Sequence, residues 1–95
     1  MSFKLIFTDE AKGQLGDLAA NGRRLKKVRK CLGFLETNPS HPSLHSHKYS
    51  VMKSEDNRYL WESYVENNTP AAWRVFWFYG PENEQITIVA ITEHP

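Results

Sequence analysis

The sequence predicts an α+β fold in which an N-terminal strand and a two-helix hairpin pack on one face of an antiparallel β-sheet. A strand-like run opens the chain, and two segments with helical periodicity follow it. The second half alternates apolar runs with short turn-forming segments. Because these connections are too short for crossover helices, we expect an antiparallel meander. The 95 residues are expected to form a single domain spanning 1–95.

The first strand is predicted over 3–7 (FKLIF). Thr8 is a typical N-cap, and Asp9 and Glu10 then fall in the first helical turn, where the macrodipole favours anions. The pattern predicts a helix from there to about Ala20. Its apolar side consists of Ala11, Leu15 and Leu18.

The second helix is predicted over 23–37. Asn21-Gly22 separates it from the first helix, and we expect Gly22 to stop that helix in a left-handed conformation. The short link indicates an antiparallel hairpin of helices. The core-facing side of the second helix is formed by Leu25, Val28, Leu32 and Leu35.

A loop with two prolines is predicted over 38–46 (NPSHPSLHS). Strands are expected to follow, each bounded by polar, Gly or Pro residues. Their ranges are 48–52, 59–66, 71–79 and 85–92.

Composition excludes several classes of protein. No run approaches the roughly 18 apolar residues that cross a bilayer, and the N-terminus is charged too early for a signal peptide. Cys31 is the single cysteine, which excludes an intramolecular disulfide and a cysteine zinc site. We therefore expect a soluble, cytoplasmic protein without a membrane partner.

The net charge of +1 is unevenly distributed along the chain. Residues 1–48 carry nine Lys/Arg against four Asp/Glu, whereas residues 49–95 carry three against seven. A basic first half indicates a surface for a polyanion or an acidic protein partner. The near-neutral total argues against indiscriminate nucleic-acid binding.

The run 71–78 (AAWRVFWF) is predicted to be a central strand, and it carries one charge, Arg74. A buried charge is costly unless it is paired or lines a site. One interpretation pairs Arg74 with Glu62 or Glu66 of the neighbouring strand. The other makes it a clamp for phosphate, which the planar, bidentate guanidinium suits. The two are compatible, and we expect the Trp73 side of this strand to pack on the helices.

The histidines leave several interpretations open. His94 is either part of a frayed terminus or a proton donor or acceptor at the end of the last strand. His41, His45 and His47 are either solvated loop residues or contacts for a substrate backbone, together with Lys48. A metal site at these histidines is disfavoured because no Asp, Glu or Cys stands at ligand spacing.

The second helix carries a basic side. Six of the eight residues in RRLKKVRK are Lys or Arg. They form either a solvated surface or a ridge for phosphates or a docking partner. The residues opposite the apolar side are Arg23, Lys26, Lys27 and Lys30. Aromatic residues that belong either to the core or to a base-stacking surface are Tyr49, Tyr59, Trp61 and Tyr64.

Taken in order, five segments resemble the RelE/ParE toxin superfamily of type II toxin–antitoxin systems. They are FTDEAKGQLGDLA, RLKKVRKCLGFLETNPSHPSLHSHKYS, LWESYV, AAWRVFWFY and ITIVAITEHP. The resemblance implies a microbial-ribonuclease-like fold. It also implies, for the RelE branch, metal-independent cleavage of mRNA, generally on the ribosome, by attack of the 2′-hydroxyl on the adjacent phosphate. No cofactor is implied.

The resemblance also assigns roles to residues. Arg74 matches the arginine that stabilises transition-state charge, and His94 matches a C-terminal general acid. Glu62 or His47 is implied as the general base. Further phosphate contacts are Lys48 and Lys53, with the helix residues Arg23, Lys26, Lys27 and Lys30 as an RNA-binding ridge.

Three functional hypotheses follow from the sequence. The first is an mRNA endoribonuclease toxin whose partners are a cognate antitoxin, mRNA and the ribosome. The second is a ParE-like toxin that inhibits DNA gyrase by binding, favoured by Pro95 where some members end in Tyr. The third is a non-toxic homologue that binds a partner. Assembly as a homodimer is compatible with each.

Overall fold

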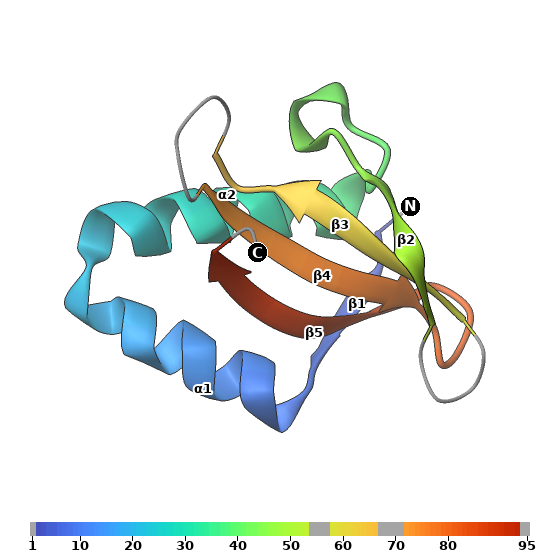
Figure 1. Ribbon diagram of the computed structural model, residues 1–95, viewed down its shortest axis with the longest axis horizontal. Coiled ribbons are helices and arrows are strands. Elements are labelled where there is room, and N and C mark those ends of the chain that lie inside the picture. The colour runs from blue at the N-terminus through green and yellow to red at the C-terminus, as the bar shows by residue number, and fades with distance from the viewer. Residues whose placement is uncertain (1, 54–57, 67–71, 94–95) are drawn as a thin grey trace.

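The computed structural model describes residues 2–53, 58–66 and 72–93 (Figure 1). A strand, two α-helices joined by a 3₁₀ turn, a second 3₁₀ turn and four strands follow one another along this chain. The elements are β1 (Lys4–Phe7), α1 (Asp9–Asp17), η1 (Leu18–Ala20), α2 (Gly22–Thr37), η2 (Pro42–Leu44), β2 (His47–Lys53), β3 (Tyr59–Tyr64), β4 (Trp73–Tyr79) and β5 (Gln85–Glu93).

The five strands form one sheet in the order β1-β5-β4-β3-β2. Strands β2 to β5 are the predicted antiparallel meander, and the α+β fold class is confirmed. The sheet is mixed rather than wholly antiparallel, because β1 pairs with β5 in parallel, with Leu5 opposite Ile86. The helices and the meander separate these two strands in sequence, so no tight turn forces them to be antiparallel.

Two side chains fasten α1 to β5, one at its N-cap and one further along the helix. Thr8 caps it as predicted, because its Oγ1 accepts a hydrogen bond from the Ala11 amide at 3.1 Å and donates one to the Val89 carbonyl at 2.8 Å. Further along α1, the side-chain Oε1 of Gln14 accepts a hydrogen bond from the Ile91 amide at 2.6 Å. In the described part of the chain the pairing of β1 ends opposite Ile88, so α1 satisfies part of the β5 edge beyond it.

The link between the helices differs from the prediction. Gly22 is the first residue of α2 and does not adopt a left-handed conformation. Instead, Asn21 ends η1 and caps α2, with its Oδ1 accepting a hydrogen bond from the Arg24 amide at 3.2 Å. The link is so short that one residue serves both helical segments, which leaves no separate position for a glycine stop.

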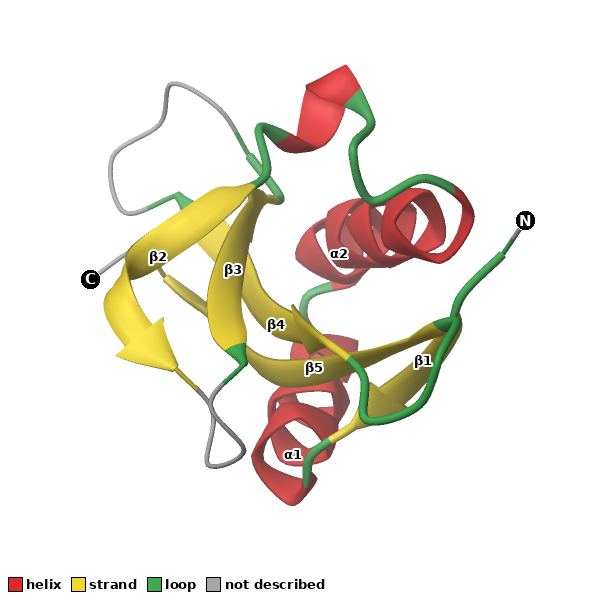
Figure 2. Cartoon of the chain, turned by 90° about the vertical axis from the view of Figure 1, so that its right-hand side faces the viewer, coloured by secondary structure: helices red, strands yellow, loops and turns green. Residues whose placement is uncertain are grey.

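The core lies between the helices and one face of the sheet (Figure 2). Val75 and Trp77 of β4 are fully buried there, and Trp73 packs at its edge, which confirms the predicted orientation of this strand. Residues Ile88 and Ile91 of β5 both reach this core because the β4–β5 register shifts by one residue between them. The helices contribute Ala11, Leu18, Val28, Cys31, Leu32 and Leu35.

A buried relay of hydrogen bonds ties the loop before β2 to the sheet. Trp77 Nε1 donates to Ser63 Oγ at 2.7 Å, and Ser46 Oγ donates to the Pro39 carbonyl at 2.9 Å. The two serine hydroxyls lie 2.7 Å apart, so the Ser63 hydroxyl is the donor between them. The relay fixes the start of β2 next to β3.

Candidate functional site

Strand alternation places the candidate site on the sheet face opposite the core. Ser63 and Val75 point into the core, so their neighbours in sequence point the other way. Arg74 lies opposite Tyr64 on β3, and Glu62 lies opposite His47 on β2. Four residues discussed in the sequence analysis therefore lie on one face of three strands: His47, Glu62, Tyr64 and Arg74.

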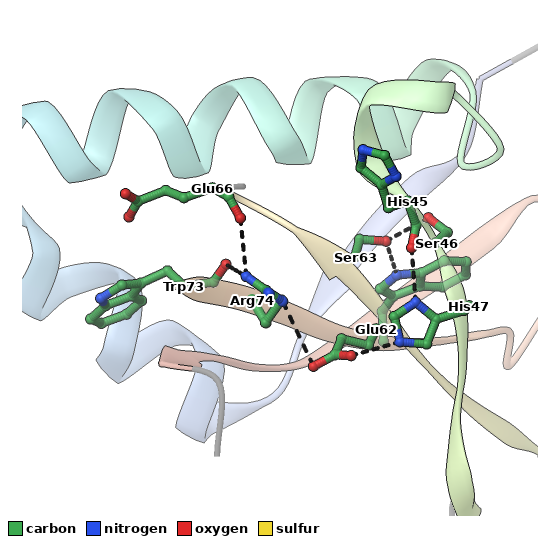
Figure 3. Close-up of polar contacts among 9 residues, drawn as sticks. His45, Ser46, His47, Glu62, Ser63, Glu66, Trp73 and Arg74 are labelled. Carbon is green, nitrogen blue, oxygen red and sulfur yellow. Dashed lines mark hydrogen bonds and ion pairs between the residues drawn. The ribbon is translucent and has the colours of Figure 1, made fainter. Parts of the chain in front are cut away.

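Glu62 is at the centre of this arrangement (Figure 3). The residue is only 2% exposed. Its Oε1 lies 2.7 Å from His47 Nε2, and its Oε2 lies 3.9 Å from Arg74 Nε. A buried carboxylate is costly unless it is paired, and here an imidazole nitrogen and a guanidinium flank its two oxygens.

His47 is held by both ring nitrogens. Its Nδ1 lies 2.9 Å from the His45 carbonyl oxygen, which accepts a hydrogen bond, while its Nε2 faces Glu62. His45 adopts a left-handed backbone conformation, with φ of 47°, at the end of η2. The local chain path, rather than the His45 side chain, therefore orients the His47 ring. The His47 side chain remains 46% exposed, so it borders the solvent above Glu62.

Arg74 is 8% exposed and its orientation is fixed. Its Nη1 donates to the carbonyl oxygens of Glu66 and Trp73 at 3.0 and 3.1 Å (Figure 3). Its guanidinium carbon lies 3.7 Å from the centroid of the Tyr64 ring. Among the described residues its buried Nε has no hydrogen-bond partner. The guanidinium is thus held from one side while Nε–H is available toward Glu62.

Glu66 links this site to α2. Its carboxylate oxygens lie 3.8 Å from Arg24 Nε and 3.6 Å from Lys27 Nζ, while its carbonyl holds Arg74. Glu66 was predicted, as an alternative to Glu62, to pair with Arg74 as an acid, whereas the observed contact is to its backbone carbonyl. The backbone contact was missed, because side-chain patterns carry no information on which carbonyl turns toward a neighbouring strand.

A groove of about 420 Å³ adjoins the site between α2, η2 and the end of β3. Tyr64 and Glu66 belong both to this groove and to the surroundings of Arg74. The remaining walls combine two lysines of α2 with largely apolar residues of α2, η2 and the segment that follows β3. They are formed by Lys27, Lys30, Cys31, Phe34, Ser43, Leu44 and Val65.

The structure does not bring every predicted residue to Arg74. Lys48 pairs with Trp61 on the other face of the sheet, with its Nζ 4.1 Å from the Tyr59 ring centroid. Arg23 and Lys26 are exposed on α2. His94 and the side chain of Lys53 lie outside the described part of the chain.

The three loop histidines have separate environments. The His41 ring stacks on Phe34, with 4.1 Å between centroids, and its Nδ1 accepts a hydrogen bond from the Ser43 amide. The His45 ring lies beside the Tyr64 ring, with 5.3 Å between the ring centroids. Within the described ranges, no three His, Cys, Asp or Glu side chains gather as a potential metal site.

Comparison with known proteins gives similarity in fold. No protein-family model and no curated protein matches the sequence. Among solved structures, a YoeB/ParE toxin from Agrobacterium tumefaciens aligns over 98% of this chain and 100% of its own, with a TM-score of 0.73 at 11% identity. The YoeB dimer of Staphylococcus aureus aligns over 100% of both chains, with a TM-score of 0.70 at 14% identity.

An archaeal RelE in complex with RelB, from Pyrococcus horikoshii OT3, aligns over 98% of this chain and 96% of its own, with a TM-score of 0.70 at 13% identity. No helix in the described ranges is both long and apolar enough to cross a membrane. The mixed five-stranded sheet, with its helices against one core, is common to these toxins and to this protein. The chain therefore has the RelE-like fold of the YoeB and RelE toxins.

Proposed function

We propose that this protein is the toxin of a type II toxin–antitoxin pair and that it inhibits translation by cleaving mRNA at the ribosome. The observation that carries the proposal is the position of Glu62, held between His47 and Arg74 on the sheet face opposite the core. Cleavage by an internal 2′-hydroxyl requires a base, a cation at the phosphate and an acid for the leaving oxygen. In this proposal the first two come from adjacent strands, the base from β3 and the cation from β4.

Glu62 is the general base in this proposal. The alternative base, His47, has one ring nitrogen against the His45 carbonyl and the other against Glu62. Because Nδ1–H donates to the carbonyl, Nε2 is the nitrogen left to act as a base. That nitrogen faces Glu62 and not a substrate. Glu62 accepts the 2′-hydroxyl proton, and His47 orients the carboxylate.

Arg74 stabilises the negative charge that develops on the phosphate. Preorganised donors contribute most when they need no rearrangement during the reaction. The Tyr64 ring and two carbonyl oxygens already hold this guanidinium in place. Arg74 lies beside Glu62, so the carboxylate would face the attacking 2′-hydroxyl while the guanidinium faces the phosphate. His94 is proposed as the acid that protonates the leaving 5′-oxygen.

A cognate antitoxin is the proposed protein partner. Three of the similar structures support it: RelE bound to RelB, YafQ of Escherichia coli bound to DinJ, and YoeB of Staphylococcus aureus bound to YefM. The YoeB dimer supports self-association as a further arrangement. The exposed basic residues of α2 provide a surface for an acidic protein segment.

The test is cleavage of mRNA in a translation extract by the purified protein. Primer extension would locate 5′-hydroxyl ends in the wild-type reaction. Arg74→Ala is expected to lower the rate by about 10²- to 10³-fold, and His94→Ala to lower it by at least about 10²-fold. Lys12→Ala replaces an exposed residue of α1 and serves as the control variant, purified and assayed in the same way. Thermal unfolding of each variant separates lost catalysis from lost structure.

Intact mRNA with the folded wild-type protein and ribosomes present would contradict the proposal. A DNA-damage response on induction, without translation arrest, would then assign the protein to the gyrase-inhibiting class. Unchanged growth on induction without an antitoxin would instead indicate a homologue that only binds a partner.

A further inference from the structure

We infer that the groove between α2, η2 and the end of β3 is a subsite for the RNA nucleotide next to the cleaved phosphate. This inference rests on the proposed ribonuclease function and adds a second place where the strand is held. Its ligand class is a single nucleotide within RNA, recognised through its phosphate and the apolar surface of its base.

The first support is continuity with the site. The Arg74 guanidinium carbon lies 3.7 Å from the centroid of the Tyr64 ring, and Tyr64 is also one of the residues that line the groove. A strand whose phosphate contacts Arg74 therefore meets the groove as soon as it passes Tyr64. The volume of about 420 Å³ falls within the range of small-molecule sites, about 300–1,000 Å³.

The second support is the chemistry of the walls. Lys27 and Lys30 stand on the α2 side and are exposed, so their ammonium groups are accessible to a phosphate. Apolar lining comes from Phe34, one turn after Lys30 on α2, and from Leu44 of η2 and Val65 after β3, which suits the flat apolar surface of a base. Cationic and apolar lining within one groove matches the phosphate and the base of a nucleotide.

The acidic residue in the groove does not oppose this assignment. Glu66 is only 16% exposed at its side chain, and its carboxylate is already paired with Arg24 and Lys27. Lys30 has no acidic partner in the described part of the chain, and its Nζ lies 6.0 Å from the Phe34 ring centroid. Lys30 is therefore the cation that remains for a phosphate.

The test uses binding rather than cleavage. The probe is a short fluorescein-labelled RNA with 2′-O-methyl groups, which lacks the attacking hydroxyl and cannot be cut. Fluorescence anisotropy would give its affinity over a series of salt concentrations. Lys30→Gln is expected to weaken binding and to reduce the slope of log K against log salt by about 0.7, the value for one phosphate on a single strand.

Arg29→Gln is the matched control. It removes the same charge from the same helix, but Arg29 lines a different hollow beside β1. Its salt slope should equal that of the wild type. As a second measurement, the methyl NMR signals of Leu44 and Val65 should shift when the uncut RNA is added, since both side chains line the groove.

Equal salt slopes for the two variants, or unshifted Leu44 and Val65 methyl signals at saturation, would overturn the inference. An acidic protein segment would then be the better occupant. Failure of the proposed function has a different signature: the wild type binds the modified RNA at the groove but leaves the unmodified RNA intact. The two proposals are therefore tested separately.

Discussion

The guanidinium of Arg74 rests on the face of the Tyr64 ring, its carbon 3.7 Å from the ring centroid. The two residues are direct partners on β3 and β4, so the contact is built into the strand register. A cation over an aromatic face contributes about 0.5–2 kcal/mol, depending on solvent exposure. Here it also determines where the donor atoms of Arg74 point.

Replacing Tyr64 tests this contact. Tyr64→Leu removes the ring and is expected to lower the cleavage rate, with a modest loss of stability, because Arg74 loses its support. Tyr64→Phe keeps the aromatic face and should retain most of the activity. Single-turnover cleavage and urea unfolding of both variants measure the two effects. Equal activity of the Leu and Phe variants would show that the ring does not position Arg74.

The assignment of the base is tested by comparing Glu62→Gln with His47→Asn. If Glu62 takes the proton, Glu62→Gln lowers single-turnover cleavage by about 10²- to 10⁴-fold. His47→Asn should cost less, because it removes only the partner that orients the carboxylate. The reverse order of the two effects would make His47 the base. Circular dichroism of both variants controls for the fold.

Ser63→Ala interrupts the relay that holds the start of β2. The change leaves Trp77 Nε1 buried without its acceptor, which should cost about 1–3 kcal/mol of unfolding free energy. Ser40→Ala, a similar change on the exposed loop, should stay within about 0.5 kcal/mol of the wild type. Urea denaturation measures both. A Ser63→Ala protein as stable as the Ser40→Ala control would show that the relay contributes little.

Cys31 predicts a dependence of stability on high pH. Burial raises the pKa of its thiol from 9.0 to about 12. The folded protein therefore keeps the proton between these values while the unfolded chain loses it, so stability falls as pH rises above 9.0. At pH 10 the loss from this group is about 1.4 kcal/mol.

Urea unfolding of the wild type and of Cys31→Ala at pH 7 and pH 10 isolates this effect from other titrating groups. The wild type should lose more stability than the variant between the two conditions. In the native protein the thiol should also react slowly with a disulfide reagent, and fully after denaturation. Fast native labelling would contradict the buried, protonated thiol.

The fold follows from local patterns that the sequence displays directly. Thr8 caps α1, the apolar stripe of α2 enters the core, and the two faces of β4 divide as predicted. These features depend on the period of apolar residues and on capping side chains, which act within a few positions. The prediction that Arg74 pairs with Glu62 or Glu66 rests instead on the meander, because adjacent strands place such residues on one face, and the carboxylate beside Arg74 is that of Glu62.

Features that depend on backbone direction were not foreseen. One is the parallel pairing of β1 with β5, and another is the extra residue in β5. An apolar strand has the same sequence pattern whether its neighbour is parallel or antiparallel, and with or without such a bulge. His45 adopts a left-handed conformation that places its carbonyl oxygen beside His47. This conformation is uncommon for a residue other than glycine, so the sequence does not predict it. Lys48 was assigned to the phosphate, but the register of β2 turns it to the other face.

The pairing of β1 with β5 has a consequence for the order of assembly during synthesis. Thr8 donates a hydrogen bond to Val89, 81 positions further along the chain. The first strand therefore has no neighbour in the sheet until the last strand has left the ribosome. Helical segments fold early from local contacts, whereas such distant pairings form late. The sheet of this protein therefore stays incomplete, with β1 unpaired from β5, until residues 85–88 have emerged.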